Sequence, residues 1–317
     1  MDKLKKVGLT ALGTALVSTA SFAGDMAVTG SAQITYAGND NTASGNRFSM
    51  SDTLTFSGSG ELDNGWTVSL TMAIDGGTND ANDIKIDMGD AGALNFAGTD
   101  GSGPVGGWDD MMPTANEESW ANAAGTKSTI ASAAIGDNAF TYTNSTLVDG
   151  LAIELFYLPS NDGATTDAGG AENASSTQYG AKYTGIDGLE IGYAAGDNEA
   201  VSTNVIENTV MYAKYTMDAF TFGIQSNEVD QQTASADTEF MAYGVSYAVS
   251  DELSVSYGAS EVEHQNASLV DQEAAAVSFS YVSGGMTISG SMANVDNVGG
   301  TSTVDNSGYE LNVAFAF

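Results

Sequence analysis

The chain is dominated by short runs in which apolar side chains alternate with small or polar ones. In residues 26–36 the even positions carry Met, Val, Ile, Tyr and small residues, while the odd positions carry Ala, Thr, Ser and Gln. The runs 66–75 and 253–257 repeat this pattern, with Trp, Val, Leu, Met, Ile and Tyr on one face. A period of two predicts β-strands that have one apolar and one polar face.

Sixteen such runs follow one another, and each is expected to form a strand. They cover residues 26–37, 47–60, 66–75, 83–89, 93–98, 138–144, 151–158, 176–184, 189–195, 207–216, 220–227, 239–248, 253–259, 274–281, 286–293 and 307–317. An even number is what a closed antiparallel barrel with both termini on one side requires. Because no linker interrupts residues 24–317, we expect one domain there.

The connections between the runs fall into two classes by length. Short connections are expected to form hairpin turns at 63–65, 89–92, 185–188, 217–219, 250–252 and 283–285. Longer connections rich in Asn, Asp and Gly are expected at 38–46, 76–82, 99–137, 159–175, 196–206, 228–238, 260–273 and 294–306. Short periplasmic turns and long external loops are typical of outer-membrane barrels.

Alternating strands also occur in water-soluble sandwiches, where the apolar face packs against a second sheet. No segment after residue 23 is continuously apolar for the ~20 residues that a spanning helix requires, so membrane insertion would have to use strands. Aromatic residues beside the short turns favour a barrel with an interfacial girdle. They are Tyr183, Tyr215, Phe220, Tyr247 and Tyr281. We therefore predict an all-β fold, a sixteen-stranded antiparallel transmembrane β-barrel.

The composition is strongly acidic, with 41 Asp and Glu against 8 Lys and Arg and a formal net charge of −33. Three lysines within the first six residues precede an apolar stretch and the small-x-small sequence Ser21-Phe22-Ala23, as in a cleavable secretory signal peptide. A membrane anchor is the weaker alternative, because the stretch is short and lacks stop-transfer charges. Cleavage after residue 23 would make the net charge two units more negative, −35.

This composition excludes several classes of function. Scattered cations cannot supply the basic footprint that nucleic-acid binding requires. The chain has no Cys and a single His, His264, which excludes the common zinc and thiol sites. Because His264 lies in an expected external loop, a barrel hydrolase is disfavoured and no enzymatic activity is expected. An acidic surface or adhesion protein built as a calcium-bound solenoid would need a nonapeptide repeat that is absent.

Several motifs, each weak alone, occur in an order that resembles the general porins of Gram-negative outer membranes, in the style of the sixteen-stranded alphaproteobacterial type. They are the signal peptide, the opening Gly24-Asp25-Met26-Ala27-Val28-Thr29-Gly30, the turn Glu61-Leu62-Asp63-Asn64-Gly65-Trp66, the segment Gly106-Gly107-Trp108-Asp109-Asp110 and the terminal Phe317. The resemblance spans the whole chain. It implies a homotrimer of water-filled pores among outer-membrane lipid and lipopolysaccharide, passing small hydrophilic solutes and ions by passive diffusion. It also implies that the third loop folds into each lumen as a constriction.

The longest interruption of the strand pattern, 99–137, is therefore the candidate constriction loop. Its Trp, Met and Pro residues are expected in an ordered loop with its own packing. If the loop folds inward, its carboxylates line one side of the pore, whereas in an ordinary surface loop they would merely face water. The candidate constriction acids are Asp100, Asp109, Asp110, Glu117 and Glu118.

Strand alternation places four cations toward the lumen, on the basic wall of the pore. They are Arg47, Lys85, Lys182 and Lys214. A lipid-facing Lys would cost about 2–4 kcal/mol at the membrane midplane, which supports inward placement. In the resembling porins a dense basic cluster faces the loop acids, but four isolated cations cannot form one. Each could instead pair with an inward carboxylate such as Asp87, Glu190 or Glu207. We therefore expect a net negative lumen that prefers cations.

Two further questions concern ligands and selectivity. Asp109-Asp110 and Glu117-Glu118 offer hard oxygen ligands for weakly bound Ca²⁺, although their spacing does not match an EF-hand loop. No other cofactor or metal is expected. A solute-specific channel is the closest alternative to a general diffusion pore. The inward positions are mostly Ser, Thr, Ala, Gly and Asn rather than an aromatic or basic ladder, which favours the general pore.

Overall fold

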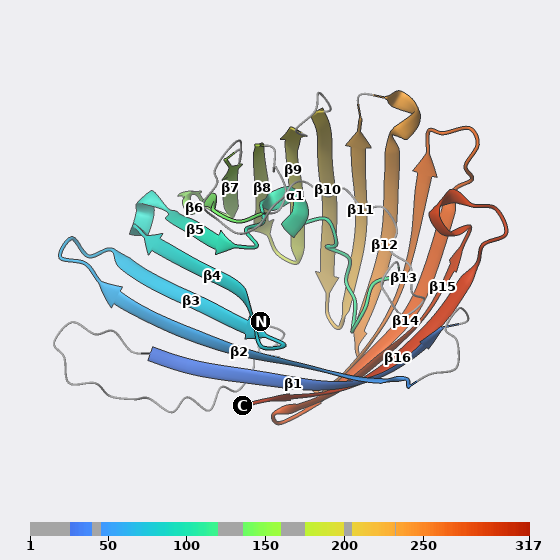
Figure 1. Ribbon diagram of the computed structural model, residues 1–317, viewed down its shortest axis with the longest axis horizontal. Coiled ribbons are helices and arrows are strands. Elements are labelled where there is room, and N and C mark those ends of the chain that lie inside the picture. Colours follow the sequence, from blue (N-terminus) through green and yellow to red (C-terminus); the bar gives the residue numbers. More distant parts are fainter. Residues whose placement is uncertain (1–25, 40–45, 120–135, 160–174, 200–204, 232) are drawn as a thin grey trace.

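The computed structural model of the protein describes residues 26–39, 46–119, 136–159, 175–199, 205–231 and 233–317. The expected signal peptide, 1–23, lies outside the described residues. All sixteen predicted strands are present (Figure 1). The first eight are β1 (Met26–Asn39), β2 (Phe48–Glu61), β3 (Thr67–Asp75), β4 (Thr78–Asp87), β5 (Ala93–Thr99), β6 (Ala139–Val148), β7 (Leu151–Leu158) and β8 (Ser176–Ile186). The remaining eight are β9 (Leu189–Glu199), β10 (Val205–Met217), β11 (Phe220–Asp230), β12 (Thr238–Ala248), β13 (Leu253–His264), β14 (Gln272–Ser283), β15 (Met286–Asp296) and β16 (Asn306–Ala316).

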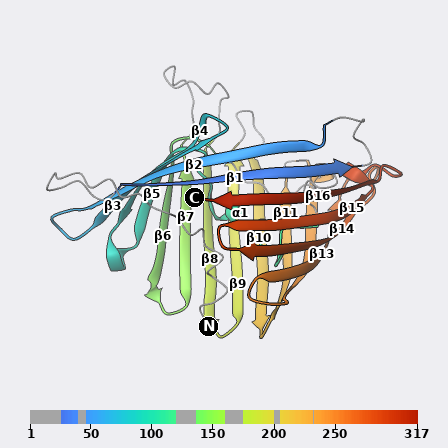
Figure 2. The same cartoon turned by 90° about the horizontal axis from the view of Figure 1, so that it is seen from below.

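The sheet closes on itself. Each strand pairs antiparallel with its sequence neighbours, and β1 pairs with β16, which it lies beside in Figure 2. At this seam the backbones of Gly30 and Phe317 exchange two hydrogen bonds of 2.7 and 2.9 Å. Closure leaves no unpaired strand edge, which is the condition for a sheet in lipid. The predicted sixteen-stranded antiparallel barrel is therefore confirmed, and the sandwich alternative is wrong.

Alternation along the strands puts apolar side chains on the outside of the barrel. Met50, Leu70 and Met211 are among the outward side chains that are more than half exposed. The five aromatic residues expected at the short-turn end also face outward, and the rings of Phe220 and Tyr247 stack with centroids 4.5 Å apart. These features are those of a barrel with a lipid-facing band and an interfacial aromatic girdle.

Carboxylates replace the apolar residues on the outer face at the opposite end of the barrel. Several of them lie directly opposite one another across neighbouring strands, as in Glu207 with Asp230 and Glu228 with Glu239. Like charges in such positions repel, so this rim is favourable only in a polar, ion-containing medium. It marks the end of the apolar band. The acids of this rim are Glu207, Glu228, Asp230, Glu239, Glu261, Glu263, Glu273 and Asp296.

This rim explains why many strands are longer than expected. β13 continues to His264 and β9 to Glu199, whereas the sequence pattern predicted ends at residues 259 and 195. Backbone pairing continues past the point where the outward residues become acidic and the apolar alternation stops. One predicted long loop, 76–82, is also wrong. β3 and β4 are joined only by Gly76 and Gly77, both with positive φ, as a two-residue hairpin turn requires.

Helical structure is minor and lies in the connections. The α-helix α1 (Pro104–Gly107) lies inside the barrel, and the 3₁₀ turns η2 (Gly89–Ala91), η4 (Ala234–Ala236) and η5 (Val298–Gly300) lie between strands (Figure 1). None of the helices in the described part of the chain is long and apolar enough to cross a membrane.

The seam between β1 and β16 gives a stability prediction. A side chain at Gly30 would place its Cβ 2.5 Å from the ring of Phe317 and 3.0 Å from Leu54. Gly30→Val should therefore lower the unfolding free energy by about 1–3 kcal/mol, the usual cost of overpacking. The measurement is urea unfolding of protein refolded into lipid vesicles. Gly60→Val is the control, because no atom lies within 4 Å of an added Cβ there. Equal losses in both variants would contradict the prediction.

Candidate functional site

The connection between β5 and β6 enters the barrel rather than covering its outside. Its described part comprises residues 100–119 and 136–138, and the rest of the candidate constriction loop lies outside the described residues. The backbone N–H of Val105 donates to Oε1 of Gln178 at 3.1 Å, and that of Met111 donates to Oε1 of Gln225 at 2.8 Å. Both glutamines are buried side chains on the inner face of the wall. The predicted inward fold of this loop is therefore confirmed (Figure 1).

Further along, the loop crosses to the strands next to the seam. The N–H of Ala115 donates to the Ser256 hydroxyl of β13 at 2.8 Å. The side-chain amide of Asn116 donates to Oε1 of Glu310 on β16 at 2.7 Å. Because its polar groups are matched at many points on the inner wall, the loop has a defined path from β8 to β16.

Apolar contacts anchor the same loop. Val105 and Trp108 pack against Val210 and Tyr212 of β10, and the Trp108 and Tyr212 rings meet edge to face with centroids 6.3 Å apart. Met112 is buried in a second cluster, with Phe240, Ala242 and Val262. These clusters take the place of a hydrophobic core, which an open barrel otherwise lacks.

Glycines in the wall make room for the loop. An added Cβ at Gly180 would lie 2.6 Å from the Trp108 ring, and one at Gly223 would lie 2.4 Å from Cδ of Pro113. Gly223, Gly244 and Gly258 are direct cross-strand neighbours and form one row on the inner face. A row of inward glycines indicates that another segment packs against the wall. The sequence analysis missed this row because it can be recognised only when the strand register is known.

Four of the five predicted constriction acids are brought together. Burial, together with the neighbouring charges of Asp110 and Glu118, raises the pKa of Asp109 to about 7. Burial also raises the pKa of Glu118 to about 7, helped by Asp110 and Glu117. The pKa of Glu117 is raised by burial and by the charge of Glu310. Mutual repulsion of this kind requires that the carboxylates share one small region.

The fifth predicted acid, Asp100, stands apart. It lies exposed at the start of the loop, where its backbone N–H donates to the Asp137 carboxylate at 3.1 Å. Glu310 replaces it in the cluster, and the sequence analysis missed this residue. Its position opposite the loop depends on barrel closure, which brings β16 next to a segment almost 200 residues earlier in the chain.

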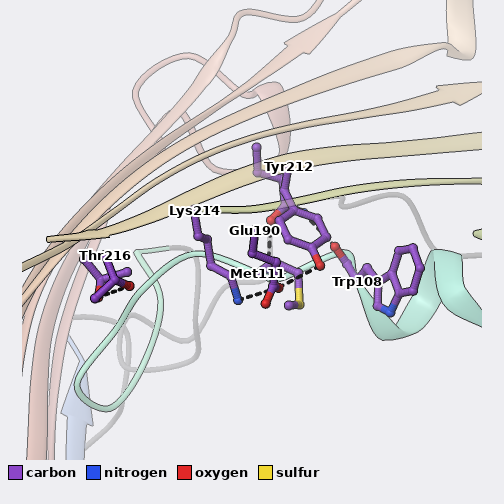
Figure 3. A network of polar contacts seen from close by, with 8 residues as sticks. Trp108, Met111, Glu190, Tyr212, Lys214 and Thr216 are labelled. Carbon is purple, nitrogen blue, oxygen red and sulfur yellow. Dashed lines mark hydrogen bonds and ion pairs between the residues drawn. The ribbon is translucent and has the colours of Figure 1, made fainter. Parts of the chain in front are cut away.

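Three of the four predicted wall cations face the lumen. The Lys214 ammonium lies 3.1 Å from Oε1 of Glu190, which also accepts a 2.9 Å hydrogen bond from the Tyr212 hydroxyl (Figure 3). The pairing of Lys214 with Glu190 was one of the alternatives that the sequence left open. Lys182 lies 5.8 Å from the centre of the Trp108 ring, and Lys85 lines a cavity together with Lys182.

The expectation that Arg47 faces the lumen is wrong. Arg47 precedes the first residue of β2, and its guanidinium donates a hydrogen bond to the Tyr309 hydroxyl. The guanidinium also covers Gly38. Strand alternation places both Gly38 and Tyr309 on the outer face of the barrel. Outside the regular strand, alternation no longer fixes the direction of a side chain, and the tyrosine hydroxyl and ring attract the cation.

The position of His264 also differs from expectation. His264 ends β13 rather than lying in an external loop, and it is half-buried beside Gly300. Within the described residues, no group of three or more His, Cys, Asp or Glu side chains is arranged to hold a metal ion.

The wall glycines give a prediction about the loop. Gly223→Ala should displace Pro113, because a proline ring has little freedom to move away from a Cβ at 2.4 Å. We expect thermolysin to cleave the loop near Met111 and Met112 several times faster than in the unmodified protein. Gly258→Ala is the matched control, since its Cβ would meet neighbours only at ordinary contact distances of 3.5 Å or more. Unchanged cleavage of Gly223→Ala would show that the loop is not held at this row.

Comparison with known proteins adds three structural likenesses and one sequence match. The structure matches OmpF of Salmonella typhi, solved in complex with daunomycin, with a TM-score of 0.70 and 14% identity over 93% of this chain and 98% of that one. It matches an anion-selective porin from Comamonas acidovorans with a TM-score of 0.68 and 14% identity over 92% of this chain and 99% of that one.

A triple mutant of the Rhodopseudomonas blastica porin matches with a TM-score of 0.64 and 17% identity over 92% of this chain and 100% of that one. At these identities the likeness shows the fold alone. Comparison with curated proteins finds no match. The sequence profile of Gram-negative porins, however, matches residues 8–300.

Proposed function

This chain belongs to the Gram-negative porin family and is an outer-membrane channel protein, and from that premise we propose that its pore is cation-selective. The pore admits small hydrophilic solutes and ions by passive diffusion, and the loop between β5 and β6 forms its constriction. The protein works without catalysis, as a homotrimer surrounded by lipid and lipopolysaccharide. The one observation that carries the selectivity is the imbalance of charge on the inner surface.

Carboxylates outnumber cations among the described residues that face the lumen. The loop contributes four and the wall at least four more, against three lysines, one of which is already paired with Glu190. Rings of carboxylates attract cations, and a narrow passage is incompletely screened at the ~8 Å Debye length of physiological salt. The acids are Asp109, Asp110, Glu117, Glu118, Asp87, Glu154, Glu190 and Glu310, and the lysines are Lys85, Lys182 and Lys214.

The fold by itself does not set the sign of selectivity. The Comamonas acidovorans protein shares the fold and is described as anion-selective. The sign therefore has to come from the side chains at the constriction, where this chain has Asp109, Asp110 and Glu118 close together with no described cation among them.

The reversal potential across a planar bilayer under a KCl gradient tests the proposal. We expect the cation-selective sign. At pH 9, well above the pKa of Asp109, Asp109→Asn with Asp110→Asn should reduce the cation-to-anion permeability ratio by roughly half, because negative charge leaves the constriction. Glu228→Gln with Glu239→Gln removes two charges from the outer face and should leave the ratio unchanged. An anion-selective potential would overturn the proposal. Conductance steps that do not occur in threes would count against the trimer.

Selectivity should also depend on pH in the neutral range. Asp109 and Glu118 have pKa values of about 7, so both are mainly neutral at pH 5 and charged at pH 9. The cation-to-anion permeability ratio should therefore rise as pH increases through about 7, when two negative charges appear at the constriction. Reversal potentials recorded from pH 5 to pH 9 measure this step. Asp109→Asn with Glu118→Gln should flatten it, and an equally steep step in that variant would mean that other groups titrate.

A further inference from the structure

A cavity of about 320 Å³ opens on the inner wall, and none of the four clustered loop carboxylates lines it. Its walls come from β4 to β8 and from η2, and Trp108 of the loop borders it. Along the wall, Asp87, Ala93, Thr143 and Glu154 are successive cross-strand neighbours in one row. Ala93 and Thr143 are small, so they form a shallow floor between the two carboxylates.

One positive and one negative side chain flank the floor at each of its two ends. Lys85 and Asp87 lie on β4, while Glu154 and Lys182 lie on β7 and β8. In the part of the chain that the structure describes, the one ion pair within 4.0 Å is that of Lys214 and Glu190, outside this cavity. The four charged side chains therefore line one cavity without forming ion pairs with one another.

The surroundings hold these charges in place. Trp108 is buried in the apolar cluster with Val105 and Tyr212, and its backbone carbonyl accepts a 3.2 Å hydrogen bond from Gln225. Its ring lies 5.8 Å from the Lys182 ammonium, a favourable cation–π distance that keeps this lysine at the cavity. Asp87 is fixed by accepting a 2.9 Å hydrogen bond from the backbone N–H of Gly89.

We propose that this cavity is a binding subsite for zwitterionic solutes of amino-acid to dipeptide size. The inference rests on the proposed channel function and names a solute class for it. A solute with one carboxylate and one ammonium can meet a lysine on one side of the floor and a carboxylate on the other. A simple anion or cation would be attracted by half of these charges and repelled by the rest. The volume is at the lower limit of small-molecule sites, ~300 Å³.

Binding at this subsite is weak, in the millimolar range. The cavity is open to the lumen and its charged groups are exposed or half-buried, so water competes for each of them. Weak binding is also what passage requires, because a solute that enters favourably must leave again.

The test uses single channels of the refolded protein and the dipeptide alanyl-alanine as probe. We expect a saturable, concentration-dependent block, and at least tenfold weaker block by N-acetyl-alanyl-alanine amide, which has the same shape without either charge. Lys85→Gln with Lys182→Gln should weaken the dipeptide block at least tenfold. Asp87→Asn with Glu154→Gln should do the same. Lys214→Gln, which removes a lumen cation outside this cavity, should change the dipeptide affinity less than twofold.

Two outcomes overturn the proposal while leaving the channel intact. One is a conducting pore that shows no saturable block, and the other is equal block by alanyl-alanine and by its singly charged, end-capped forms. A second readout separates these from failure of the channel function. With Trp66→Phe and Trp120→Phe, Trp108 becomes the sole tryptophan and its fluorescence should change on titration with the dipeptide. If the protein inserts but does not conduct, the channel proposal fails, and this titration still decides whether the subsite exists.

Discussion

The barrel exists because β1 and β16 pair through backbone hydrogen bonds and close the sheet. In hydrocarbon an unpaired backbone N–H or C=O costs several kcal/mol, so a sheet can span the membrane only when its last strand pairs with its first. Closure here runs over nine residue pairs, from Ser31 with Ala316 to Asn39 with Gly308. Once the sheet is closed, every strand has an inside and an outside. The alternation of side chains then has a physical meaning at each position, with lipid or polar surroundings on one face and the lumen on the other.

The interior of a barrel this wide cannot be filled by the wall side chains alone, so a loop occupies part of it. The segment after β5 is bound to the wall by backbone donors to Gln178, Gln225 and Ser256, and by two small apolar clusters. Inward-facing glycines leave space on the inner wall for the loop to pack closely against it. The loop brings its own carboxylates into a partly desolvated region, which is why their pKa values rise. Its tryptophan also borders the cavity lined by charges of both signs.

The acidic residues of the chain lie in two different surroundings. Some carboxylates lie inside the barrel, where they face the lumen. Others form an outward rim beyond the apolar band, on strand extensions that the sequence pattern assigned to loops. At the rim, direct cross-strand pairs such as Glu261 with Glu273 repel and must be screened by the ions of the outer medium. The same residue type therefore lines the lumen in one place and borders the apolar band in the other.

The strands, their number and the faces they present could be predicted from the residue pattern, because a period of two is a local property that can be recognised without knowledge of the register. The pattern also predicted that Lys85, Lys182 and Lys214 face inward, since each sits within a regular strand. Prediction failed at positions where the pattern is interrupted. Arg47 lies outside β2 and turns to the outer face, and residues 76–82, expected as a loop, belong mostly to β4.

Contacts between residues that are distant in the sequence depend on the three-dimensional arrangement of the strands. Glu310 joins the loop carboxylates because closure places β16 beside a segment far away in the chain, and no local pattern carries that information. The glycine row beneath the loop and the cavity between β4 and β8 likewise depend on the register of several strands at once. Alternation fixes the direction of a side chain, but the contacts that give it a chemical role depend on the stagger of the whole barrel.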